Sequence, residues 1–106
     1  SKSTVTREII DLCIKQALAA NADYYLELFD RQSQSKKRLL AALSRGGKNI
    51  FSAEYIRKNQ LTSGATVQRA VSELLETGVV EKNKDEYFIT DPFFRYFIKN
   101  PERTVK

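Results

Sequence analysis

Apolar residues recur every three to four positions along most of the chain, a spacing that predicts amphipathic helices. Four segments show it clearly: residues 5–20, 22–31, 35–45 and 64–77. Ser35, Ser52 and Ser63 are the N-cap candidates, since a serine side chain can accept a hydrogen bond from the backbone N–H groups that begin a helix. Ser52 predicts a further short helix through Lys58.

The period changes to strand-like after Gly78, a glycine suited to the left-handed residue that ends a helix. Residues 79–82 and 87–90 flank a charged turn, Asn83 to Glu86, and together they predict a β-hairpin. Asp91 and Pro92 are typical of a helix start. Aromatic residues cover most of the circumference of this last helix, so we expect it to dock on the domain.

This order of elements predicts a mainly α fold with a small β-hairpin, a winged helix-turn-helix preceded by N-terminal helices. Ile50 and Phe51 are candidates for the brief strand that such a fold places after its first helix. We predict three parts: an N-terminal helical extension (1–34), the winged helix with its C-terminal helix (35–100) and a loose tail (101–106).

In DNA-binding winged helices the second helix of the pair enters the major groove, and the hairpin, or wing, contacts the backbone. Gln and Arg can read base edges, whereas Ser, Thr and Lys can bind phosphates. The candidate nucleic-acid-binding residues are Ser63, Thr66, Gln68, Arg69 and Ser72 on the 64–77 helix, and Lys82 and Lys84 on the wing. A solvated helix face would show a similar pattern.

The net charge of +5 favours an anionic partner, but its distribution weakens that inference. It divides into +3 over residues 1–47, zero over residues 48–90 and +2 over residues 91–106. Glu73 and Glu76 oppose phosphate contact on the candidate helix, so duplex DNA binding by this chain alone should be weak. The basic run Lys36-Lys37-Arg38 indicates either a solvated helix start or contact with an acidic partner or phosphate.

Catalysis has little support in the sequence. The chain has no histidine and one cysteine, so the commonest general base is absent and a thiolate metal site cannot form. Gly46-Gly47-Lys48 lacks the spacing of a phosphate loop and is better interpreted as a helix-ending turn. Cys13 lies among Ile9, Leu12 and Ile14, where we expect a buried, inert thiol. We therefore predict a non-enzyme with no catalytic, cofactor-binding or metal-binding residues.

A single cysteine and the lack of a signal peptide or an apolar membrane span indicate a cytoplasmic location. The absence of methionine and the polar opening residues indicate a segment of a longer protein, although removal of an initiating residue is an alternative.

Much of the chain resembles the C-terminal winged-helix domain of prokaryotic AAA-type P-loop ATPases, first described largely from archaea. The matching stretches are Leu28-Phe29-Asp30 with residues 35–43, Thr66 to Val71 with Leu74-Leu75 and residues 78–80, and Tyr87 to Phe97. The Asp-Pro followed by aromatic residues is the most distinctive feature. Gly64 departs from the pattern, because relatives often have proline there.

This resemblance implies a parent protein whose upstream ATPase module binds ATP and magnesium, through residues that this chain does not contain. The winged helix would then bind duplex DNA or pack on the ATPase module and regulate it. Two alternatives remain open: a protein-interaction module that does not bind DNA, and a free-standing winged-helix transcription regulator.

Overall fold

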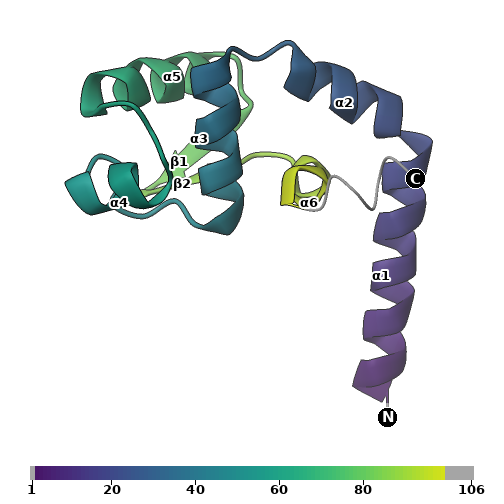
Figure 1. Ribbon diagram of the computed structural model, residues 1–106. Coiled ribbons are helices and arrows are strands. Elements are labelled where there is room, and N and C mark those ends of the chain that lie inside the picture. The colour runs from purple at the N-terminus through teal and green to yellow at the C-terminus, as the bar shows by residue number, and fades with distance from the viewer. Residues whose placement is uncertain (1, 100–106) are drawn as a thin grey trace.

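The computed structural model describes residues 2–99, together with their side chains except those of residues 2–6 and 18. Within this range the chain forms six helices and one antiparallel hairpin (Figure 1). The helices are α1 (Lys2–Ala20), α2 (Ala22–Asp30), α3 (Gln34–Arg45), α4 (Ala53–Lys58), α5 (Gly64–Glu76) and α6 (Pro92–Lys99), and the strands are β1 (Val80–Asn83) and β2 (Glu86–Ile89). The predicted winged-helix fold class is confirmed. The predicted loose tail lies outside the described residues.

Short polar contacts fix the helix starts. The Ser52 side chain accepts a hydrogen bond from the Tyr55 N–H at 3.1 Å, and that of Ser63 accepts one from the Thr66 N–H at 3.2 Å, as predicted. The prediction for Ser35 was wrong, because α3 begins earlier and Ser33 caps it. Ser33 has the extended backbone that an N-cap needs, whereas Ser35 already lies in the first helical turn.

The core lies where α3 crosses α5 and where β2 and α6 pack against α3. Its members are at most 6% exposed and come from every element except α1 and α4; the largest fully buried ones are Phe94, Leu39, Leu40, Ile50, Leu74 and Val80. Each such side chain contributes about 1.5–3 kcal/mol through burial. Two leucines near the core are more accessible: Leu61 is half-buried and Leu75 is 37% exposed.

The last helix docks on the core, as its aromatic content predicts. Phe94 and Phe97 are buried, and the ring of Tyr25 from α2 lies 5.8 and 6.0 Å from theirs. Asp91 caps α6 by accepting a hydrogen bond from the Phe93 N–H at 2.8 Å. Its other carboxylate oxygen accepts one from the Tyr25 hydroxyl at 3.1 Å. One aspartate therefore starts α6 and ties it to α2.

The third strand of the sheet is reduced to a single bridge, between Lys48 and Glu86. The expected strand at Ile50 and Phe51 does not form, because Ile50 turns inward and is 1% exposed. Gly47 allows its backbone segment to approach β2 closely, since a Cβ at this position would lie 1.7 Å from the Tyr87 carbonyl oxygen. The Tyr87 N–H donates to the Gly47 oxygen at 3.0 Å. This glycine pair therefore ends α3 and anchors β2.

The wing is tighter than predicted. Asn83 pairs with Glu86 at the end of the ladder, so only two residues, Lys84 and Asp85, connect the strands. Lys84 has a left-handed backbone with φ 58°, which is the conformation that short hairpin turns require.

The first helix points away from the rest of the molecule (Figure 1). Its apolar residues Ile9, Ile10 and Leu12 are 57%, 52% and 56% exposed. Helix α1 nevertheless reaches the domain: Ile14 packs against the core, and α1 contacts α6. The expectation of a buried Cys13 was wrong: the thiol is exposed, although the next residue, Ile14, packs against the core. Successive residues of a helix point in different directions, so the two side chains lie on different faces of α1.

Candidate nucleic-acid interface

Helix α5 occupies the position of the recognition helix. Its buried face, which includes Val67, Val71 and Leu74, packs on α3. This packing turns Gln68, Arg69 and Ser72 outward, and all three are exposed. The structure thus brings these three predicted residues together on one open helical face.

Ser63 and Thr66 stabilise the start of α5. The Ser63 hydroxyl accepts from the Thr66 N–H, and the two hydroxyls lie 3.0 Å apart in a second hydrogen bond. Ser63 remains exposed and Thr66 is half-buried. Both predicted residues therefore have a structural role at this helix start, which is independent of any phosphate contact.

Glu73 on α5 forms an ion pair with Lys36, the first residue of the basic run, at 2.6 Å. The hydrogen bond from Lys36 holds the pKa of the Glu73 carboxyl below its ordinary value. The sequence interpretation counted Glu73 as a charge that opposes phosphate. The ion pair compensates this charge, whereas Glu76 forms no ion pair with any of the residues that the structure describes.

The other two residues of the basic run also contact the domain itself. The ammonium group of Lys37 lies 5.7 Å from the centroid of the Phe29 ring, within the range of a cation–π contact. A guanidinium nitrogen of Arg38 donates to the Gln60 carbonyl oxygen at 3.4 Å. The run is therefore neither a purely solvated helix start nor a continuous cationic patch.

The wing lysines occupy different positions on the hairpin. Lys82 lies on β1 with its ammonium group 5.4 Å from the centroid of the Tyr87 ring. Lys84 lies in the turn. Both side chains are exposed, but Glu81, Asp85 and Glu86 are exposed beside them. The wing offers two cations within a surface of mixed charge.

The prediction missed a basic concave surface between α3 and the end of α4. Two adjoining hollows of about 310 and 290 Å³ share Arg45, Lys58 and Asn59 in their linings. Lys48 lines the first hollow and Arg38 the second. We call this surface the α3–α4 groove. The signal in the sequence was the spacing of Arg38 and Arg45, which places them on one face of a helix.

Hydrogen bonds hold the floor of the groove in place. The Tyr55 hydroxyl donates to the Gly46 carbonyl oxygen at 2.6 Å, and burial raises the pKa of Tyr55 to about 12. A guanidinium nitrogen of Arg45 donates to the Asn59 side-chain oxygen at 3.1 Å. The side-chain nitrogen of Asn59 donates to the Tyr55 carbonyl oxygen at 3.0 Å. These contacts link the end of α3 to α4.

Within residues 2–99, no three His, Cys, Asp or Glu side chains are grouped so that they could hold a metal ion. Over the same residues, no helix combines the length and the hydropathy that a membrane crossing requires.

The helix pair α4–α5, closed by α3, the hairpin and α6, defines a winged helix-turn-helix domain. The chain matches the family model described as a probable winged helix domain over residues 23–100, well over half of its length, and it belongs to this family. The matched range includes α2, whose Tyr25 is part of the core. Comparisons with curated proteins and with solved structures gave no match.

Proposed function

We propose that this domain is the non-catalytic winged-helix module of a larger P-loop ATPase and that it binds duplex DNA weakly through α5 and the wing. The observation that carries the DNA-binding part is the open face of α5 with Gln68, Arg69 and Ser72. The compensation of Glu73 by Lys36 at 2.6 Å supports it further, because it removes one repulsive charge from this side.

The contact would be mainly with the DNA backbone. Arg69, Lys82 and Lys84 are the cations that α5 and the wing offer, so two or three phosphates can be neutralised. Backbone attraction of this kind gives dissociation constants of about 10⁻⁴–10⁻⁶ M, and two or three contacts give a slope of log affinity against log salt of about −2 to −3.

The ATPase part of the proposal rests on the resemblance of the sequence to such winged helices. Nucleotide and magnesium would bind in the parent's own ATPase module. A cytoplasmic location fits this role.

Fluorescence anisotropy with a random-sequence duplex at two salt concentrations tests the proposal. The Arg69→Ala variant should weaken binding several-fold, because Arg69 is the basic residue on the α5 face. Arg7→Ala removes the same charge from the exposed part of α1 and should leave the affinity nearly unchanged. Equal effects of both variants would contradict a role for α5.

A second function, regulation through protein contact, is favoured by exposed apolar residues on α1 and α2. Tyr24 is 58% and Leu26 41% exposed, in addition to Ile9, Ile10 and Leu12. Exposed apolar groups of this kind mark protein-interaction surfaces. The natural partner would be the parent's own ATPase module, and such a contact is compatible with DNA binding by α5.

A further inference from the structure

We propose that the α3–α4 groove is a second binding surface for the phosphodiester backbone of duplex DNA, separate from α5 and the wing. This inference extends the proposed DNA binding to a part of the fold that the recognition-helix geometry does not use. It rests on the charge, shape and lining of the groove.

The groove concentrates positive charge. Arg38, Arg45, Lys48 and Lys58 line its two hollows, and Glu86 is the one carboxylate among the lining residues that the structure describes. The α5 face and the wing have fewer cations and more acids. Because duplex DNA binds largely through neutralisation of phosphates, the groove is the stronger backbone site of the two.

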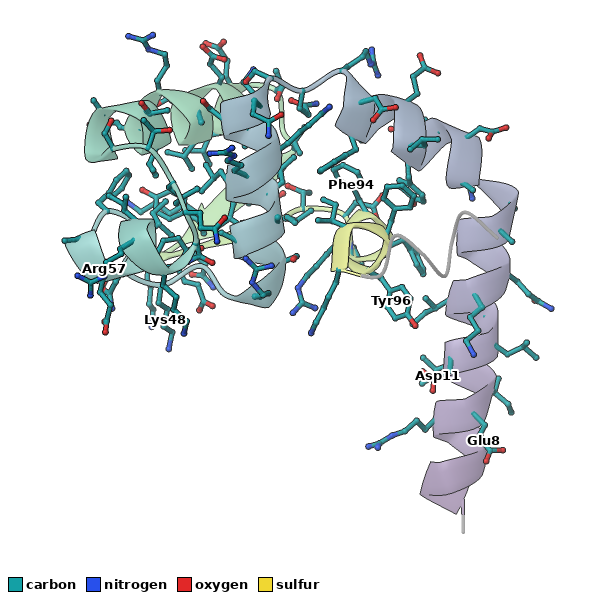
Figure 2. All side chains as sticks on the ribbon, in the orientation of Figure 1. Glu8, Asp11, Lys48, Arg57, Phe94 and Tyr96 are labelled. Carbon is teal, nitrogen blue, oxygen red and sulfur yellow. The ribbon has the colours of Figure 1, made fainter. Side chains whose placement is uncertain are left out.

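The cations of the groove are available to a ligand. The described residues form one ion pair, Lys36 with Glu73, and it lies outside the groove. Arg38 and Arg45 each have a neutral hydrogen-bond partner, which holds the side chain in position without cancelling its charge. Figure 2 shows Lys48 extending from the α4 end of the molecule.

The spacing of the cations suits a repeating anion. Arg38 and Arg45 lie about two turns apart on α3, which is about 10 Å along the helix axis. Successive phosphates of one strand of duplex DNA are closer together than this length, so the row can contact more than one phosphate. The two hollows are open and adjoin along this direction, and a single small anion would leave one of them unfilled.

The lining favours a nucleic acid over an acidic protein. The core of a protein interface is rich in apolar and aromatic side chains. None of the exposed large apolar residues of the described chain lines either hollow. The one aromatic residue there, Tyr55, is half-buried and its hydroxyl is already bonded to the Gly46 oxygen.

The test compares two double variants of the full chain in fluorescence anisotropy with a random-sequence duplex. Lys48→Ala/Lys58→Ala removes the two groove lysines, whose side chains are exposed. Lys15→Ala/Lys99→Ala removes two exposed lysines of α1 and α6, so the net charge of the two proteins is equal. Circular dichroism confirms that both remain folded, and a Lys48→Gln/Lys58→Gln variant replaces the alanine variant if that one unfolds.

When the groove also contacts DNA, the wild-type salt slope is steeper than the value of about −2 to −3 given by α5 and the wing alone. We expect the groove variant to weaken binding about tenfold at low salt and to make this steeper slope shallower by about 2, one for each phosphate that the variant no longer neutralises. The control variant should change the affinity less than twofold. Equal losses of affinity in both variants, or a groove variant that binds as the wild type does, would overturn the proposal. Competition by poly-L-glutamate as effective as that by duplex DNA would assign the groove to an acidic protein instead.

The Arg69→Ala variant separates this inference from the proposed function. If α5 does not contact DNA, Arg69→Ala has no effect while the groove variant still weakens binding. If the groove is not a DNA site, Arg69→Ala weakens binding and the groove variant does not. A wild-type chain that binds no duplex at low salt overturns both.

Discussion

Helices α1 and α6 both flank the winged helix, and both are rich in apolar residues, yet their environments differ. The eight residues of α6 bury Phe94 and Phe97 against α2 and α3. The nineteen residues of α1 leave Ile9, Ile10 and Leu12 more than half exposed. Helix length does not explain the difference, since the shorter helix is the buried one. A helix is buried only where the fold provides a complementary surface, and α6 meets such a surface between α2 and α3.

Removing each helix in turn should give the largest difference in stability between the two regions. Truncation after Thr90 should lower the free energy of unfolding by several kcal/mol, because each buried aromatic side chain contributes about 1.5–3 kcal/mol. Removal of residues 1–20 should lower the free energy of unfolding by about 1 kcal/mol or less, since Ile14 is the one apolar side chain packed on the core among those of α1 that the structure describes. Urea unfolding measures both. Similar decreases in stability would show that α1 is as integral to the fold as α6.

Single substitutions sharpen the same contrast without changing the chain length. Phe94→Ala should destabilise the domain by about 3–5 kcal/mol, because it leaves a cavity at a fully buried position. Ile9→Ala should change the stability by no more than about 0.5 kcal/mol, as is usual for exposed positions. Thermal unfolding followed by circular dichroism measures both changes. A large effect at Ile9 would indicate that another surface covers α1 in solution.

The smallest expected change in stability concerns the hydrogen bond from Tyr25 of α2 to Asp91, the residue that caps α6. Tyr25→Phe removes the 3.1 Å hydrogen bond to Asp91 but keeps the ring beside those of Phe94 and Phe97. The substitution should lower the free energy of unfolding by about 0.5–1.5 kcal/mol near neutral pH. An unchanged stability would show that the aromatic stack alone holds α6 in place.

The stabilisation by this hydrogen bond also depends on pH. Burial, with the Asp91 hydrogen bond as second cause, raises the pKa of Tyr25 from 10.0 to about 12. The unfolded chain therefore ionises Tyr25 at lower pH than the folded chain does. The Tyr25 hydroxyl makes its full contribution to the free energy of unfolding below pH 10.0. This contribution is lost as the pH rises towards about 12. The stability difference between wild type and Tyr25→Phe should narrow over this interval in urea titrations.

Much of the fold follows from local patterns. The serines at 52 and 63, the glycines at 46 and 78 and the Asp91-Pro92 pair each act on backbone groups within a few residues. Their effect is therefore readable in the sequence. The error at Ser35 arose because Ser33 and Ser35 are equally suitable in type, and only the backbone conformation distinguishes them.

The candidate interface could be predicted from the sequence less completely than the fold. The helical period of α5 predicts the outward direction of Gln68, Arg69 and Ser72. The partners of the basic run were not predictable, because Lys36 reaches a glutamate far along the chain and Arg38 a distant carbonyl oxygen. The groove residues are likewise scattered over α3, the Lys48 bridge and α4, and no short motif joins them.

The order of the helices, the hairpin and the winged-helix fold could be predicted from the sequence, because they depend on residue type and local spacing. The ion pair of Lys36 with Glu73, the exposure of Cys13 and the gathering of four cations in one groove could be seen only in the folded arrangement. The exposure and the electrostatic environment of a side chain depend on which distant segments lie beside it, because the packing of the core brings those segments together.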